Sequence, residues 1–302
     1  MSKDTPIGFI GLGQMGWPMA KRLVEAGYTV HVLEADSARS AAFVKEIGGE
    51  AHMSGQSLAK TVQTIITILP TSGIVRSVLE ANDGVLAGVQ PGTILIEMSS
   101  GVPSITRQLA ERMTQAGGRL VDAPVSGGVP RAKTGELSIM FGGDAELLES
   151  LSPILRCMGQ AIEPTGDVGS AHAMKALNNL VSAGGFLIGV EALMIGKRFG
   201  LSPEKMVDVL NASTGMNNST QKKFKQFVLS GKFDSGFGLD LMVKDLSIAL
   251  GIAHETSTPT PFSALCRELW ASSAQMLGPN QDHTAIAKLT ETLANDSLSQ
   301  SK

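Results

Sequence analysis

Short apolar runs alternate with amphipathic stretches through the first 165 residues. The runs predict strands at 7–10, 29–33, 64–69, 93–98, 119–123 and 137–141, and the stretches predict helices at 18–26, 75–79, 103–116 and 145–158. Strands that alternate with helices are typical of a parallel, doubly wound α/β sheet. Because ligands of such sheets bind beyond the carboxyl ends of the strands, we expect a pocket near Leu69, Pro70, Ser99, Ser100 and the turn after Ala123.

The pattern changes in the second half of the chain. Helical periodicity covers residues 202–211, 221–229, 239–254, 262–276 and 284–294, with no alternating strand pattern. Before them, residues 168–199 predict one long helix. We therefore expect an α/β domain over 1–165, a connecting helix over 166–199 and an all-α domain over 200–302.

The long helix is apolar nearly all round, which predicts that it is buried. Between positions 171 and 195 its only formal charges are Lys175 and Glu191. A narrow polar stripe interrupts it at helical spacing, formed by Lys175, Asn178, Asn179 and Ser182. A desolvated lysine loses its proton more readily and can act as a general acid or base. Two structural interpretations stay open, a lysine that extends to solvent from the helix start and one paired with a carboxylate.

A membrane span is a further interpretation of this helix. Asn178, Asn179 and Glu191 interrupt the apolar run, Gly184-Gly185 loosens it, and no basic flank orients it. We therefore expect a core helix.

A glycine motif follows the first predicted strand. Gly11-Leu12-Gly13-Gln14-Met15-Gly16 lies between that strand and a helix, and a second strand then ends at Glu34. In this setting GxGxxG is typical of a dinucleotide-binding, Rossmann-type domain: the first glycine permits the turn, the second admits the pyrophosphate, and the third lets helix and strand pack closely. Without a strand before it and a helix after it, a GxGxxG motif is an ordinary glycine-rich turn.

The acid at the end of the second strand indicates which dinucleotide binds. A carboxylate at Glu34 accepts hydrogen bonds from ribose hydroxyls and repels a 2′-phosphate, and the first arginine after it is Arg39. This favours NAD over NADP. The alternative is that Glu34 or Asp36 caps the helix that begins near Ser37.

Two other segments carry candidate chemistry. In the turn 124–130, Ser126, Gly127 and Gly128 leave backbone amides able to face an anion such as a carboxylate, although an ordinary glycine turn is as good an explanation. Lys244 and Asp245 lie on the predicted helix 239–254, where a solvated helix face is the simpler interpretation.

Composition narrows the function classes. A net charge of −3 gives no sign of a nucleic-acid surface, and the N-terminus does not resemble a signal peptide. Cys157 and Cys266 lie far apart, which favours a reducing, cytoplasmic setting. His172, His254 and His283 have no ligand spacing, so we predict no metal site.

Four motifs together resemble the β-hydroxyacid dehydrogenases, a family that includes enzymes for 3-hydroxyisobutyrate, tartronate semialdehyde (the glycerate aldehyde) and threonate. They are GFIGLGQMGWPMAKRL, DAPVSGGVPRAKTGELSIMFGG, MKALNNL and VKDLSIAL, in the family's order from position 8 to about 294. Two positions depart from the family pattern: Ala171 stands where a second glycine is usual, and Arg131 where glycine is common.

The resemblance implies a role for each matching residue. Gly11, Gly13, Gln14, Met15, Gly16, Glu34, Leu69, Pro70 and Ser100 would bind the cofactor; Ser126, Gly127 and Gly128 would bind the substrate carboxylate; Lys244 would lie near both nicotinamide and substrate; and Lys175 and Asn179 would be catalytic. It implies NAD-dependent oxidation of a small hydroxy acid. Two alternatives remain, an imine reductase, which usually lacks the lysine, and a dinucleotide-binding sensor without turnover. The long apolar helix also predicts a homodimer or homotetramer.

Overall fold

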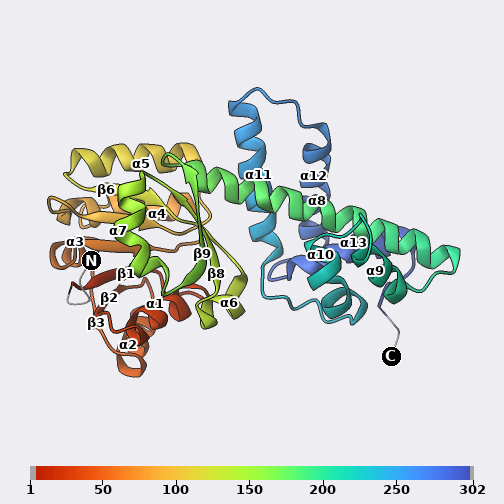
Figure 1. Ribbon diagram of the computed structural model, residues 1–302, viewed down its shortest axis with the longest axis horizontal. Coiled ribbons are helices and arrows are strands. Elements are labelled where there is room, and N and C mark those ends of the chain that lie inside the picture. Colours follow the sequence, from red (N-terminus) through yellow and green to blue (C-terminus); the bar gives the residue numbers. More distant parts are fainter. Residues whose placement is uncertain (1–4, 300–302) are drawn as a thin grey trace. The chain divides into compact units, whose positions relative to one another are not determined.

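A computed structural model of the chain describes residues 5–299 (Figure 1). The chain divides into two compact units, Met1–Lys175 and Ala176–Lys302. The boundary falls inside one long helix, α8 (Ser170–Phe199), whose first turn and a half belongs to the first unit.

The first unit is an α/β layered structure. Its strands are β1 (Ile7–Ile10), β2 (Val30–Leu33), β3 (Glu50–Ala51), β4 (Thr64–Thr67), β5 (Ile94–Glu97), β6 (Arg119–Asp122), β7 (Val125–Ser126), β8 (Leu137–Gly142) and β9 (Gly159–Gly166). Its helices are α1 (Gly16–Glu25), α2 (Ser37–Glu46), α3 (Gly55–Thr61), α4 (Ser72–Glu80), η1 (Val85–Gly88), α5 (Pro103–Gln115), α6 (Gly128–Thr134) and α7 (Ala145–Leu155). Within the described residues the sheet order is β3-β2-β1-β4-β5-β6-β8-β7, with β9 also on β8.

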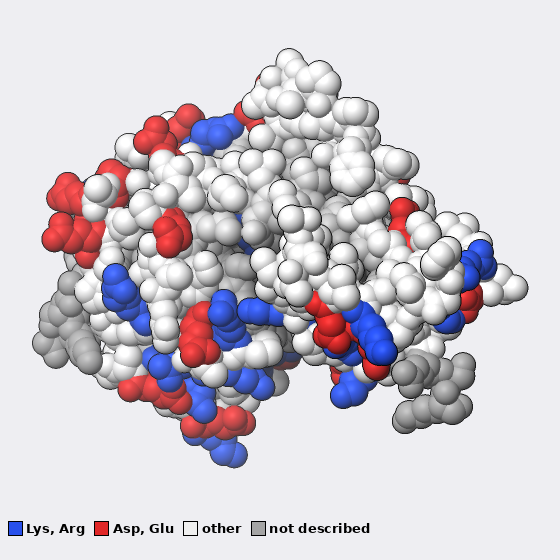
Figure 2. All heavy atoms as spheres, turned by 45° about the vertical axis from the view of Figure 1, so that its right-hand side comes forward, with Lys and Arg blue, Asp and Glu red and all other residues white. Residues whose placement is uncertain are grey.

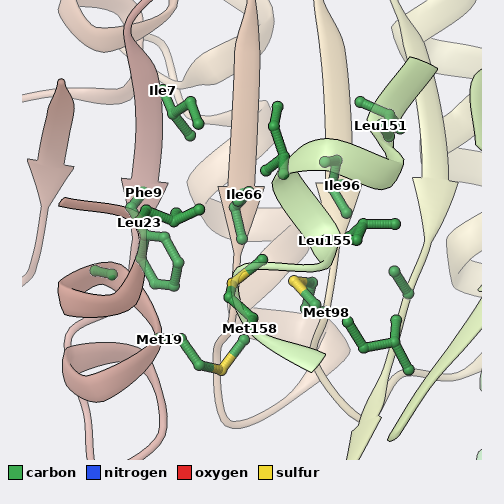
Figure 3. Close-up of a cluster of buried hydrophobic side chains, with 14 of the residues drawn as sticks. Ile7, Phe9, Met19, Leu23, Ile66, Ile96, Met98, Leu151, Leu155 and Met158 are labelled. Carbon is green, nitrogen blue, oxygen red and sulfur yellow. The ribbon is translucent and has the colours of Figure 1, made fainter. Parts of the chain in front are cut away.

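Each face of the sheet is covered by its own set of helices. Alternate residues of one strand enter different cores: Ile66 packs with α1, α2 and α7, and Ile65 packs with α3, α4 and α5. Figure 3 shows the first of these cores, where side chains from β1, β4 and β5 meet those of α1 and α7. Strands buried on both faces explain the continuous apolar runs in the sequence, and the predicted doubly wound fold is confirmed.

The sheet departs from the sequence prediction after β6. β1 to β6 are parallel, whereas β8 pairs antiparallel with both β6 and β7, and β9 pairs parallel with β8. The sequence pattern missed β3, β7 and β9. β9 contains Gly159, Pro164 and Gly166 and is largely exposed, so neither apolar alternation nor β-propensity marks it.

The second unit is helical. After its part of α8 it contains α9 (Pro203–Asn211), α10 (Asn218–Lys222), the π-helix η2 (Phe224–Leu229), α11 (Leu239–Glu255), α12 (Pro261–Leu277), the 3₁₀ turn η3 (His283–Ile286) and α13 (Ala287–Ala294). The predicted helix 221–229 is therefore broken into α10 and η2, and 284–294 into η3 and α13. Trp270 is fully buried in the unit's core.

Helix α8 is long and apolar enough to cross a membrane by composition alone, but 56% of that stretch is buried in the protein. Phe186, Val190 and Leu193 belong to the helical core, so α8 is packed as a core helix. The expectation that it is buried all round is wrong, because Val181 and Ile195 are 77% and 70% exposed.

Candidate active site

The glycine motif forms a tight turn between β1 and α1. Gly11 has φ +100°, and a Cβ on it would collide with the carbonyl oxygen of Ile68; a Cβ on Gly16 would collide with that of Gly11. Around Gly13, by contrast, a Cβ would meet nothing within 4 Å. The second glycine therefore faces open space, as the approach of a pyrophosphate requires, and its neighbour Gln14 is exposed. The residues present fit a dinucleotide.

Glu34 lies beside this turn. Its Oε2 accepts a hydrogen bond from the backbone N–H of Leu12 at 2.6 Å. The cap of α2 is Asp36, whose carboxylate accepts from the N–H of Ala38 at 3.0 Å. The capping alternative therefore holds for Asp36, while Glu34 is held at the glycine turn, where its charge opposes a 2′-phosphate.

The residues after β4 and β5 lie on the same sheet edge, because these neighbouring strands are parallel. The N–H of Leu69 donates to Ser99 Oγ at 2.8 Å, and the N–H of Ser99 donates to Glu97 Oε1 at 2.9 Å. These bonds join the segments that carry Pro70 and Ser100, both of which were predicted to contact the cofactor.

The predicted turn 124–130 is not a simple turn. Val125–Ser126 forms β7, and α6 begins at Gly128. Gly127 and Gly128 have φ +135° and +69°, and a Cβ on Gly127 would lie 2.6 Å from the side chain of Arg131. Backbone conformation alone therefore requires glycine here, so an anion site at Ser126–Gly128 stays a prediction.

A buried ionic cluster fixes the first turn of α8. Asp122, at the carboxyl end of β6, accepts hydrogen bonds from the N–H groups of Gly169 and His172 at 2.7 and 2.8 Å. His172 Nε2 lies 2.9 Å from Glu97 Oε2. His172, Glu97 and Asp122 are 1%, 3% and 0% exposed. The cluster joins the ends of β5 and β6 to the helix that carries Lys175.

Hydrogen bonding assigns a charge to His172. Thr106 Oγ1 donates its proton to the carbonyl of Val102, so it can only accept from His172 Nδ1, 2.7 Å away. Nε2 faces a carboxylate, so both ring nitrogens carry protons. Burial opposes this state, but the Glu97 and Asp122 carboxylates raise the pKa of His172, and His172 lowers the pKa of Glu97 in spite of its burial. Burial raises the pKa of Asp122.

Lys175 follows His172 by three residues, just under one turn along α8. The sequence suggested a lysine completely surrounded by apolar side chains. In the structure Lys175 is half-buried. Because the anchored turn of α8 and Lys175 belong to the same unit as the glycine motif, the predicted proton donor is attached directly to the carboxyl edge of the sheet.

A second cluster lies in the helical unit. Asn179 Nδ2 donates to Asp245 Oδ2 at 2.6 Å, and Asp245 Oδ1 lies 3.4 Å from Lys244 Nζ. Asp245 is buried, so the solvated-face interpretation is wrong for it. Since Asp245 accepts from the amide nitrogen, the Asn179 oxygen points elsewhere and accepts from Asn178 Nδ2 at 3.1 Å.

Sequence reasoning missed Asp122, Glu97, His172 and Asp245 as site components. Each acts through a partner between 47 and 75 positions away or through the adjacent lysine, and no local pattern reports such contacts. The signal available was the presence of isolated charges in otherwise apolar runs.

Two family descriptions match the chain. "NAD binding domain of 6-phosphogluconate dehydrogenase" covers residues 6–166, and "NAD-binding of NADP-dependent 3-hydroxyisobutyrate dehydrogenase" covers 169–290. The chain is 37% identical to 2-(hydroxymethyl)glutarate dehydrogenase of Eubacterium barkeri over 99% of both chains. It is 34% identical to mouse mitochondrial 3-hydroxyisobutyrate dehydrogenase, over 89% of this chain and 82% of the relative. The chain belongs to the β-hydroxyacid dehydrogenase family.

A solved structure agrees with this membership. The Mycobacterium tuberculosis 3-hydroxyisobutyrate dehydrogenase described with L-serine superposes with a TM-score of 0.86 at 29% identity, over 96% of this chain and 99% of that one. As a β-hydroxyacid dehydrogenase, this chain is an NAD-dependent oxidoreductase of hydroxy acids, and its first unit is the NAD-binding domain.

Proposed function

We propose that the enzyme interconverts a primary alcohol and an aldehyde on a small acid whose carboxylate sits on the next carbon. The names of its relatives support this choice. 3-Hydroxyisobutyrate, 2-(hydroxymethyl)glutarate and L-serine all carry a hydroxymethyl group on the carbon that bears the carboxylate, and they differ in the third substituent. Glycerate has the same arrangement. Threonate, the substrate of another member of the family, does not, which makes it the weaker candidate.

Lys175 is the proposed general acid and base. NAD, when bound, supplies the hydride acceptor. Lys175 takes the hydroxyl proton during oxidation and returns it during reduction. The observation that carries this proposal is the anchoring of α8 on Asp122, because a lysine tied to the carboxyl edge of the sheet is well placed for a ligand of that edge.

Asn179 is the proposed partner of Lys175 on the substrate oxygen. It follows Lys175 by four residues on α8, so both side chains lie on one side of the helix. Asp245 accepts from one N–H of the Asn179 amide. The second N–H of that nitrogen is the proposed donor to the substrate oxygen, whose proton Lys175 exchanges. The amides of Ser126–Gly128 are the proposed contacts of the substrate carboxylate. Lys244, beside Asp245, is proposed to lie near the substrate and the nicotinamide.

NAD is the preferred dinucleotide in this proposal. The family description for residues 169–290 names an NADP-dependent enzyme. The acid at Glu34 argues the other way for this chain, because it occupies the end of β2 beside the glycine turn and repels a 2′-phosphate.

Replacement of the lysine tests the mechanism. Lys175→Ala should keep NAD binding and lower kcat by a factor of about 10²–10⁴. Isothermal titration with NAD and steady-state kinetics measure the two effects. Glu191→Gln, which changes the other charge within the apolar stretch of α8, is the matched control and should keep both. Normal turnover in the lysine variant would reject Lys175 as the proton donor.

A substrate panel separates the remaining candidates. The five acids are 3-hydroxyisobutyrate, glycerate, L-serine, 2-(hydroxymethyl)glutarate and threonate, and a cyclic imine with reduced cofactor completes the panel. We expect turnover with one or more of the first four. Turnover of the imine alone would favour the reductase, and tight NAD binding without turnover of any compound would favour a sensor.

We also propose that the enzyme is a homo-oligomer of the cytoplasm, where its cysteines Cys157 and Cys266 stay reduced. Val181, Ile188 and Ile195 recur every seven residues on α8 and are exposed. Phe262 of α12, also exposed, lies against Gly184 of α8 and extends this apolar face. A stripe of this kind on one copy complements the same stripe on a second copy.

Light scattering after gel filtration tests this association. Val181→Glu with Ile188→Glu should convert the oligomer to a smaller species, and Glu191→Gln should not. A wild-type chain that is monomeric at micromolar concentration would contradict the proposal.

A further inference from the structure

A cluster of imidazoles and a carboxylate lies on β2 and β3, outside the site described above. The parallel pairing of these strands sets His31 directly beside Glu50. His52 follows β3 by one residue, and its N–H donates to the carbonyl of Val32 at 2.8 Å. Residues 50 and 52 point to the same face of the sheet because side chains alternate along a strand.

The ligand atoms of the three side chains converge. His31 Nδ1 lies 2.8 Å from His52 Nε2. Glu50 Oε2 is 3.8 Å from His31 Nδ1, and Glu50 Oε1 is 4.0 Å from His52 Nε2. Among the described residues, these three form the one group of histidine, cysteine or acidic side chains that could hold a metal ion. Their ligand atoms all lie within 4.8 Å of one another.

Hydrogen bonding aims the lone pair of His52 at the cluster. Ser57 Oγ donates its proton to the carbonyl of Ser54 at 2.9 Å, so it can only accept from His52 Nδ1, 3.2 Å away. His52 Nε2 therefore carries the lone pair, and His31 Nδ1 donates its proton to it. A metal-binding histidine typically donates its other ring N–H in this manner.

The two imidazoles of this cluster are buried and its carboxylate is exposed. The side chains of His31 and His52 are each 8% exposed, whereas that of Glu50 is 65% exposed. The two nitrogens are enclosed, and the carboxylate side is open to water.

We propose that His31, Glu50 and His52 form a binding site for a divalent transition-metal ion of the zinc type. Two imidazoles and one carboxylate are typical ligands of Zn²⁺ and poor ligands of Mg²⁺. Bonds of about 2.0–2.1 Å in tetrahedral geometry set neighbouring ligand atoms about 3.3 Å apart. The imidazoles separate by about half an ångström, the carboxylate approaches by a similar distance, and water takes the fourth position.

Metal binding in this site requires a change of tautomer in His31. The ion takes the place of the proton on His31 Nδ1, and Nε2 of the same ring carries that proton instead, while His52 Nδ1 keeps its own. The bound ion would cross-link β3, an edge strand of two residues, to β2 and, through Ser57, to α3. This revises our prediction of no metal site, which considered other histidines; residues 31 and 52 are brought together only by strand pairing.

Titration of the chelator-treated full chain with ZnCl₂ tests the site. We expect one equivalent of zinc to bind and no comparable binding of MgCl₂. His31→Gln and His52→Gln should abolish this equivalent. Ser57→Ala should weaken it by about 10–100-fold. His254→Gln, which removes an exposed histidine, is the control and should bind normally.

Two outcomes would overturn the proposal. One is the lack of any one-equivalent zinc binding by the wild-type chain, which would leave only a hydrogen-bonded histidine pair. The other is equal binding by the His31→Gln, His52→Gln double variant, which would assign the zinc to other groups such as Cys157. Circular dichroism and NAD titration of each variant establish that it is folded.

Discussion

The two units each bury a histidine, and they hold it in opposite charge states. His172 in the first unit is enclosed by Glu97 and Asp122 and carries two protons. His283 in the second unit stacks on Trp270 with ring centroids 6.4 Å apart. Its Nε2 lies 2.8 Å from Lys223 Nζ, which can only donate, so this nitrogen must be an acceptor and His283 is neutral.

Burial lowers the pKa of both histidines, and the charges of their partners make the difference between them. Carboxylates raise the pKa of His172 although burial opposes them, whereas burial and Lys223 lower the pKa of His283 to about 4 despite the opposing charge of Asp282. His283 is therefore packed as an aromatic core residue. His172 is an ionic joint between the sheet and α8, and its charge matters to the helix that carries Lys175.

The largest expected effect is that of removing the charged histidine. His172→Leu leaves two carboxylates buried without a cation, which should lower the free energy of unfolding by about 3–5 kcal/mol. Because the first turn of α8 also loses the side-chain contacts of His172 with Glu97 and Thr106, kcat should fall while NAD binding persists. Urea unfolding and steady-state kinetics measure these changes.

A conservative replacement separates positioning from simple instability. His172→Gln keeps one donor for Glu97 and should recover part of both losses. If His172→Leu were as stable and active as the wild type, the ionic joint would not be what holds α8.

The second expected effect is an opposite pH dependence of the two histidines. An unfolded histidine has a pKa of about 6.5. The stability supplied by His172 is complete below that value and is lost as pH rises through its raised pKa. That of His283 is complete above about 6.5 and is lost as pH falls toward about 4, by about 3 kcal/mol in all.

Differences in Tm between wild type and variant isolate each histidine from other titrating groups, including Asp282 and Glu97. The difference in Tm between wild type and His172→Gln should become smaller from pH 6 to 9. The difference in Tm between wild type and His283→Gln should become smaller from pH 7 to 4.5. Differences that change in the same direction would refute the opposite charge assignment.

The smallest expected effect is a change in the pKa of one group, the imidazole of His283. Lys223→Met removes the cation beside His283, so the pKa of His283 should rise from about 4 toward its ordinary value, held back by the remaining burial. Titration of the histidine ring nitrogens by NMR measures it, with His172 as an internal reference that should not shift. An unchanged His283 would mean that burial alone sets its pKa.

The fold was largely predictable because its signals are local. Apolar runs such as 7–10 and 94–97 and the amphipathic helices between them are written in adjacent residues, as are the three glycines of the turn. β9 was not predictable, since its Pro164 and exposed residues gain a strand conformation only from β8. The antiparallel pairing of β8 was not predictable either, because it depends on which edge of the sheet is still unpaired once β6 is in place.

The candidate site was predictable only in part, and the reason is distance along the chain. Lys175 and Asn179 are marked by polarity within an apolar helix, a pattern visible in a short window. The orientation of Asn179 depends on Asp245, 66 positions away, and the state of His172 depends on Glu97, 75 positions away. Contacts of this range require the folded chain, so charge states could not be assigned from sequence.

The bond between Glu34 and the Leu12 N–H couples cofactor choice to the shape of the phosphate loop. An arginine at position 34 would attract a 2′-phosphate, but it offers no acceptor, and the amide of Leu12 would lose its carboxylate. A change of this one residue toward NADP therefore also perturbs the pyrophosphate turn. Redesign of cofactor use in this enzyme needs a second substitution that supplies an acceptor for Leu12, and single-site swaps at position 34 should yield catalysts poor with either dinucleotide.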